Sequence, residues 1–287
     1  MSDDIAHQMD AMISGDMSEI RVVRRLNKMF VDHNAKHNAA RSTKRVHVSA
    51  VLGSAKGAQA FCLREQILGL HYTPAPESGT ASVALLRTYL AGTYIHEMWQ
   101  DLLVESELAK SIEDSQTHAE LQVDHTPDAV VDIFGDGVLR VMEIKSAREK
   151  SYMGFLKVHT HDRAYKQCQL YMHLTGIHKG IILVQNKNDQ DFFVHLIDYD
   201  PEFVKPYVER LELLKALNKA FAETGRLPKN MLCAHEDVPR AQNCPMRQLC
   251  FANRAEREKS RREDDTASHD QDNTADNQRL NAKIGAA

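Results

Sequence analysis

The sequence lacks the features of a membrane-spanning or secreted chain. No run of about 18 apolar residues occurs among its 287 residues, so we expect no transmembrane helix and no membrane partner. The N-terminal segment MSDDIAHQMDAM is acidic and polar, without the basic start and apolar stretch of a secretory signal. We therefore expect a cytoplasmic protein.

The chain also lacks an overall positive charge and an even number of cysteines. Its formal net charge is −4, so there is no global basic field for nucleic acid, although its 36 lysines and arginines can still form local patches. Its 5 cysteines cannot all pair with one another. In a reducing compartment such residues are poor disulfide candidates and are better interpreted as thiols or metal ligands.

What the chain does contain is typical of a soluble globular protein. Hydrophobic residues make up 43% and charged residues 26%, which is enough apolar material for a sizeable core. The length indicates one large domain or one domain with attachments. We expect a flexible N-terminus with a basic helix over 1–45 and a main domain over 46–253. Residues 254–287 contain almost no apolar residues and are expected to be disordered.

Apolar periodicity predicts alternating helices and strands in the main domain. Asp200-Pro201 resembles a helix start, and Gly225 a helix stop. The elements that we expect are helices over about 80–110, 161–175 and 201–224, and strands over 119–124, 128–134, 138–144, 180–186 and 192–197. This order predicts a mixed α/β core with helices on both sides of a small sheet.

The most informative segment is HTPDAVVDIFGDGVLRVMEIKS. The turn signal at 135–137 predicts a hairpin, which would bring Asp128 and Glu143 together across neighbouring strands. Glu143 and Lys145 would point to the same face, because alternate strand residues do. Two close carboxylates favour a divalent cation between them, and oxygen ligands suit Mg²⁺ or Mn²⁺. Such a cation can activate water for phosphodiester hydrolysis, with Lys145 positioning or deprotonating that water.

Pro127-Asp128 followed by Glu143-Ile144-Lys145 resembles the motif of the PD-(D/E)XK nuclease superfamily. Gln167 and Tyr171 lie four residues apart on one helical face, and they resemble the Q-x3-Y motif of the RecB-like branch. The resemblance implies a restriction-endonuclease-like core with a helical N-terminal part. It also implies roles for the residues that match: His96, Asp128, Glu143 and the Ile144 carbonyl as metal ligands, Lys145 serving the water, and Gln167 and Tyr171 orienting the site or the strand.

Cys62 and three cysteines in the segment 231–251, namely Cys233, Cys244 and Cys250, resemble the cluster ligands of iron–sulfur RecB-like nucleases. That group includes AddB-type and CRISPR-adaptation exonucleases, and the resemblance implies a [4Fe–4S] cluster. Two other interpretations stay open. Cys233, His235, Cys244 and Cys250 form a candidate Zn²⁺ site, or the thiols are inert, and spacing alone does not decide between the metals.

The resemblance thus implies a metal-dependent DNA exonuclease that acts on single-stranded or end-bearing DNA. The resemblance places this activity in recombination, repair or CRISPR adaptation, with a protein partner from such a system. The alternative is a DNA-end-binding subunit with little nuclease activity of its own. A transposon-type or RNA-directed endonuclease on the same fold is a third, weaker interpretation.

Overall fold

A computed structural model describes residues 18–40, 45–53, 61–72, 82–159, 161–228, 232–233 and 236–251. The chain divides into two compact units. The first contains helix α2 (Ser18–Ala40) and residues 83–94 of helix α5 (Val83–Glu105), where the Arg87 guanidinium lies 5.7 Å from the centre of the Phe30 ring. The second unit contains the remaining elements. Among the described helices, none has the length and apolarity to cross a membrane.

The second unit is built on a five-stranded mixed sheet with the order β2-β5-β6-β7-β8. The central strands β6 and β7 run parallel, and the other neighbours are antiparallel. The strands are β2 (Ala109–Ile112), β5 (Ala129–Val131), β6 (Arg140–Ala147), β7 (Lys179–Asn186) and β8 (Phe192–Asp198). Every residue of β7 except the first is buried, as expected for a central strand that is covered on both faces.

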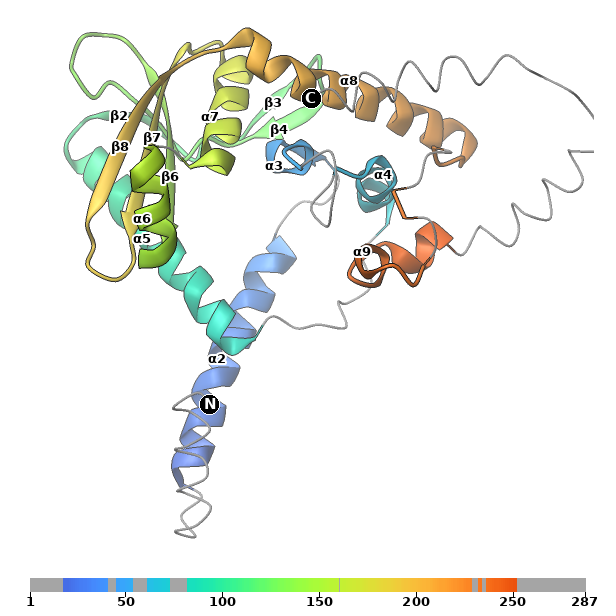
Figure 1. Ribbon diagram of the computed structural model, residues 1–287, viewed down its shortest axis with the longest axis horizontal. Coiled ribbons are helices and arrows are strands. Elements are labelled where there is room, and N and C mark those ends of the chain that lie inside the picture. Colours follow the sequence, from blue (N-terminus) through green and yellow to red (C-terminus); the bar gives the residue numbers. More distant parts are fainter. Residues whose placement is uncertain are drawn as a thin grey trace, which may run out of the picture. The chain divides into compact units, whose positions relative to one another are not determined.

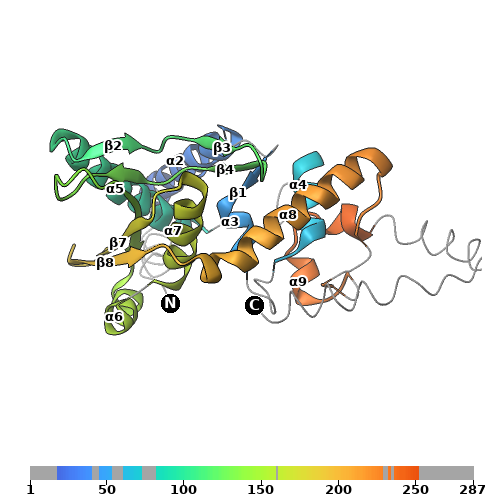
Figure 2. The ribbon, with the colours of Figure 1, turned by 90° about the horizontal axis from the view of Figure 1, so that it is seen from above.

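Helices cover the two faces of this sheet (Figures 1 and 2). On one face, Trp99 and Leu103 of α5 pack on apolar side chains of β5, β6 and β7. On the other face, helix α7 (Asp162–Thr175) buries Cys168 and Leu170 in a second cluster with Val141 and Ile182. Helix α6 (Glu149–Val158) adds Tyr152 to that second cluster. The predicted fold class, a small mixed sheet flanked by helices, is confirmed.

A second group of elements lies beside the sheet. Its three-stranded sheet has the order β1-β4-β3, and the long helix α8 packs against α4 through Ile67, Leu68, Leu214 and Phe221. Figures 1 and 2 both show α4 beside α8. The elements of this group are β1 (Val46–His47), α3 (Val48–Val51), α4 (Leu63–His71), β3 (Gln116–His118), β4 (Val123–His125), α8 (Pro201–Thr224) and α9 (Pro239–Gln242).

The ends of α8 are those that the sequence indicates. The Asp200 carboxylate accepts hydrogen bonds from the amides of Glu202 and Phe203, and Gly225 closes the helix at φ 65°. Near the middle of α8, the buried Arg210 guanidinium donates to the carbonyls of Val51 and Gly53. Arg210 therefore joins α8 to the end of α3.

Several expected boundaries are wrong. Residues 119–122 form turns, and only 123 and 124 of the expected strand 119–124 are extended, in β4, which continues to His125. The helix expected over 80–110 ends at Glu105, because the chain turns there into β2, which pairs with β5. The strand expected over 128–134 is limited to β5, while β6 continues to Ala147. The tail 254–287 lies outside the described residues, and the expected division into three parts stays a prediction.

Candidate active site

The β5–β6 hairpin brings Asp128 and Glu143 together. Its register pairs Ala129 with Met142, so Asp128, just before β5, stands across from Glu143 on β6. The Ile144 amide donates to Oδ2 of Asp128 over 2.7 Å. This hydrogen bond fixes the Asp128 carboxylate against the neighbouring strand, as the position of the turn predicts.

Glu143 is a fully buried carboxylate with incomplete hydrogen bonding. Its Oε1 accepts from Nζ of Lys145, whereas Oε2 has no hydrogen-bond partner among the described residues. Burial raises the pKa of Glu143 to about 8; Asp128 adds to the rise, while Lys145 and Arg163 oppose it. A buried acceptor without a partner is costly, so this oxygen is open to a cation.

Lys145 lies on the same face of β6 as Glu143, as expected from strand alternation. Burial lowers the pKa of Lys145, but the carboxylates of Glu143 and Asp128 outweigh that effect, and the net pKa is raised. Metal binding at Glu143 would change this charge balance, so both roles that the sequence suggests for Lys145, positioning the water and deprotonating it, stay predictions.

Helix α5 contributes two residues on one face. His96 Nδ1 lies 3.6 Å from Oδ2 of Asp128, and burial lowers the pKa of His96. A neutral ring is the form that binds a metal ion. One turn later, Gln100 donates to the Asp128 carbonyl over 3.0 Å and to Glu113 over 3.2 Å. The sequence interpretation did not include Gln100, although its spacing of four from His96 would have indicated a shared face.

Helix α7 places Gln167 and Tyr171 over the sheet face that carries Glu143 and Lys145, because Val141 on that same face of β6 packs in the cluster that contains α7. Gln167 Nε2 donates to the Tyr171 hydroxyl over 2.9 Å. Burial raises the pKa of Tyr171, with the Glu143 charge as the next cause, so the two groups are electrostatic neighbours. The structure thus brings together His96, Asp128, Glu143, Lys145, Gln167 and Tyr171, although their roles stay predictions.

The donor set suits a divalent cation. Two carboxylates, one of them with an unpartnered oxygen, and a neutral imidazole are ligands that Mg²⁺ or Mn²⁺ accepts. Within the described ranges, no three His, Cys, Asp or Glu side chains already stand in the geometry of a metal site. Ion binding would therefore require these side chains to rotate, Glu143 away from Lys145 above all.

The four cysteines of the predicted cluster also come together. Cys62, Cys233, Cys244 and Cys250 all line one small cavity of ≈ 20 Å³ between α4 and the segment that contains α9. Burial raises the pKa of Cys244 to about 11, and Glu65, Cys62 and Cys250 add to the rise. Thiolates bind iron or zinc, and Arg64, Arg240 and Arg247 on the same cavity wall would balance their charge. Among the described residues, no three of these side chains already stand in the geometry of a metal site, so the metal group stays a prediction.

The remaining cysteine and two histidines have different positions. Cys168 is a fully buried core residue of α7. His161 caps that helix by accepting from the Ala164 amide. His235, which the zinc interpretation requires, lies outside the described residues.

Comparison with protein-family models gives no match, and comparison with curated proteins gives none either. Among solved structures, LHK-Exo in complex with dAMP aligns at a TM-score of 0.48 and 19% identity, over 63% of this chain and 91% of that chain. The alkaline exonuclease (LHK-Exo) from Laribacter hongkongensis aligns at 0.48 and 18%, over 65% and 95%. SSO0001 aligns at 0.41 and 14%, over 68% and 87%.

Proposed function

We propose that this protein is a divalent-metal-dependent deoxyribonuclease, an exonuclease acting on single-stranded or end-bearing DNA. The observation that carries the proposal is Oε2 of the buried Glu143, which has no hydrogen-bond partner among the described residues and belongs to a site shared with Asp128, Lys145 and His96. Metal-assisted phosphodiester hydrolysis uses groups of this kind: a pair of carboxylates, an imidazole and an ammonium that lie close together in a partly buried site. The choice of exonuclease follows from the resemblance of the motifs to the RecB-like branch.

Each side chain has a role that its position supports. Asp128, Glu143, His96 and the Ile144 carbonyl would hold Mg²⁺ or Mn²⁺, which when bound lowers the pKa of a water ligand and stabilises charge on phosphate. The Lys145 ammonium would orient the attacking water and face the negative charge that develops on the phosphate oxygens. Gln167 and Tyr171, joined by their hydrogen bond, would border the path of the strand.

Substitution of Lys145 tests the proposal. Lys145→Ala should lower kcat on linear DNA by about 100-fold or more, because an oriented charge acts mainly in the transition state. Mn²⁺ should still raise the melting temperature of this variant, since the ligands remain. Lys179→Ala is the matched control, because Lys179 lies in an exposed ion pair with Asp198 at the start of the sheet strand β7. It should keep wild-type kcat.

Substitution of Glu143 tests the metal site separately. Glu143→Gln should abolish both the Mn²⁺-induced rise in melting temperature and DNA hydrolysis, because a neutral amide is a poor ligand. Glu223→Gln, an exposed change at the end of α8, should keep both. Binding of DNA ends by wild-type protein, without hydrolysis in Mg²⁺ or Mn²⁺, would favour the alternative of a DNA-end-binding subunit.

We also propose that Cys62, Cys233, Cys244 and Cys250 hold a [4Fe–4S] cluster. Their position around one cavity with three arginines supports this assignment. Protein purified without oxygen should contain iron and acid-labile sulfide and should absorb broadly in visible light. Zinc in elemental analysis, with no visible absorbance, would contradict the cluster and favour the zinc alternative. A partner from recombination or CRISPR adaptation stays a prediction of the resemblance.

A further inference from the structure

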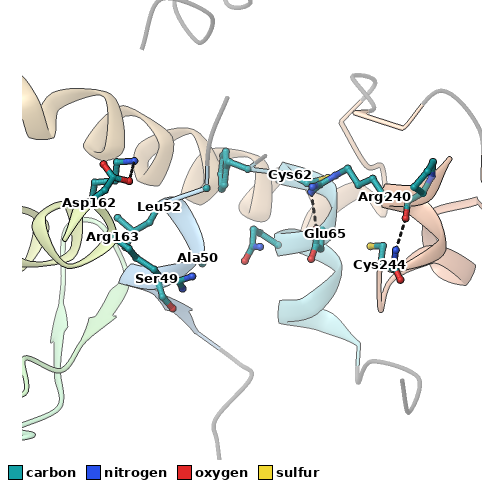
Figure 3. A pocket seen from close by; sticks show the side chains of 15 residues that line it. Ser49, Ala50, Leu52, Cys62, Glu65, Asp162, Arg163, Arg240 and Cys244 are labelled. Atoms are coloured by element: carbon teal, nitrogen blue, oxygen red, sulfur yellow. Dashed lines mark hydrogen bonds and ion pairs between the residues drawn. The ribbon is translucent and has the colours of Figure 1, made fainter. Parts of the chain in front are cut away.

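A cavity of ≈ 550 Å³ lies between the start of α7 and residues 236–251, called here the cysteine-bearing segment because it contains Cys244 and Cys250. This volume is within the range of about 300–1,000 Å³ that is usual for ligand sites. Figure 3 shows Arg163 with Ser49 and Ala50 at one end, and Cys62, Glu65 and Arg240 toward the other. The walls thus come from α3, α4, α7 and α9, which are far apart in the sequence.

Helix α7 connects this cavity to the candidate active site. Arg163, Gln167 and Tyr171 are spaced by four residues, so they lie along one stripe of the helix. The positive charge of Arg163 lowers the pKa of both Glu143 and Lys145, which places it within electrostatic reach of the site. Because Arg163 lines the cavity, the cavity wall comes within about one helical turn of Gln167.

The basic side chains in the cavity wall differ in whether they form ion pairs with acidic residues. Lys166 is paired with Asp162 over 2.8 Å, and Arg240 with Glu65 over 3.1 Å. In the part of the chain that the structure describes, the Arg163 side chain has no hydrogen bond or ion pair with a protein group. Its exposed guanidinium is thus available to an anion from solution, and guanidinium geometry matches phosphate oxygens.

The cavity wall also contains an aromatic side chain. Phe61 is half-buried there, and the Arg210 guanidinium lies 5.5 Å from the centre of its ring. Proteins that bind single-stranded nucleic acid usually combine cations that bind the phosphates with an aromatic side chain on which an unpaired base stacks. The bases of a duplex already stack on one another, so Phe61 would have no face to engage.

We propose that this cavity binds single-stranded DNA next to the bond that is cut, with Arg163 holding a backbone phosphate and Phe61 stacking on a base. The proposal rests on the proposed nuclease function and adds a strand-binding site to it. Arg163 is then a substrate-contacting residue that the motifs do not indicate, and the strand leads from the sheet toward the cysteine-bearing segment.

Fluorescence anisotropy with full-length protein tests this site. The probe is a labelled oligothymidine, and EDTA prevents cleavage. Arg163→Ala should weaken binding roughly tenfold and reduce the slope of log K against log salt by about 0.7, the value for one lost contact to single-stranded DNA. Arg226→Ala is the matched control, because Arg226 is exposed after α8 and absent from the cavity wall. It should change neither quantity.

A second variant tests the cavity without removing a charge. Ser49→Trp adds bulk at an exposed position of its wall and should also weaken binding of the oligothymidine, with the wild-type salt slope retained. A duplex of the same length should bind more weakly than the single strand. With Mn²⁺, Arg163→Ala should raise KM more than it lowers kcat, because the contact is made before the chemical step.

The proposal is overturned if Arg163→Ala and Ser49→Trp, with melting temperatures like the wild type, both bind like Arg226→Ala. That result would leave the nuclease function intact, provided that wild-type protein still hydrolyses DNA. Conversely, a wild-type protein that binds oligothymidine through Arg163 but hydrolyses nothing would contradict the nuclease function and support the strand site. Arg163→Lys, which keeps the charge, should recover most of the salt slope.

Discussion

At the scale of single residues, four side chains have a buried polar atom without a partner among the described residues, namely Arg64, His125, Glu143 and His195. Glu143 Oε2 lies in the candidate active site, where a cation would satisfy it. His125 Nδ1 lies on β4, near His118 and away from the sheet that carries Glu143. The proposed metal site does not use this ring, so we expect His125 to affect stability rather than catalysis.

His125 makes stability depend on pH. Only 3% of it is exposed, and burial lowers its pKa below 6.5; His118 adds to the decrease, while Asp124 and Asp114 oppose it. Below about pH 6.5, His125 binds a proton more readily in the unfolded chain than in the folded chain. The free energy of unfolding therefore falls as the pH falls. His125→Gln should flatten the curve of unfolding free energy, measured in urea between pH 7.5 and 5.5. An unchanged curve would contradict this assignment.

At the scale of elements, strand β7 and helix α7 approach each other unusually closely at Gly180. A Cβ atom there would lie 2.8 Å from Cys168 Sγ, 2.9 Å from Ile197 Cγ1 and 3.1 Å from Met172 Sδ. The neighbours belong to α7 and β8, both packed on the core. The absence of a side chain thus sets the distance between the helix that carries Gln167 and the central sheet.

Gly180→Ala should lower the free energy of unfolding by about 1–3 kcal/mol, the usual cost of overpacking a core. Gly154→Ala is the matched control, because that glycine lies in α6 with open space around its missing Cβ. It should raise helix stability by about 0.5–1 kcal/mol. Urea unfolding of both variants measures the difference, and equal stabilities would show that the packing at Gly180 is loose.

How much the sequence predicted depended on whether the signal was local. The β5–β6 hairpin and α8 carry their own turn and capping residues, so both were found, and Asp128, Glu143 and Lys145 followed from strand alternation. Strands β2 and β3 are short and polar, and they form only because a partner strand is available. The cavity beside Arg163 was not predicted for the same reason, since its walls come from distant segments.

At the scale of the whole molecule, contacts between the two ends of the second unit close very long loops. Arg240 pairs with Glu65, 175 positions away, and Arg64 donates to the carbonyl of Cys250 over 3.1 Å. The cysteine cavity lies at this junction. A metal group bound there would restrict the unfolded chain in the way that a long-loop disulfide does.

Cys62→Ser should therefore lower iron content and melting temperature together, with a loss of stability of roughly a few kcal/mol. Cys168→Ala is the control that keeps the metal, because Cys168 is buried in α7 and absent from the cysteine cavity. Elemental analysis and thermal unfolding measure both quantities. Under the zinc alternative that uses His235, Cys62→Ser would leave metal content unchanged.

The Ile144 amide can report on the Asp128 carboxylate by nuclear magnetic resonance, because it donates a hydrogen bond to that carboxylate. This amide lies in the central strand β6, yet its bond partner is a side chain rather than a strand carbonyl. Amides at the centre of a sheet exchange their hydrogen with solvent only through rare openings, so each such signal persists in nuclear magnetic resonance spectra. The chemical shift of the Ile144 amide consequently follows the charge on Asp128, and the state of the carboxylate can be followed in the resting protein before any substrate is added.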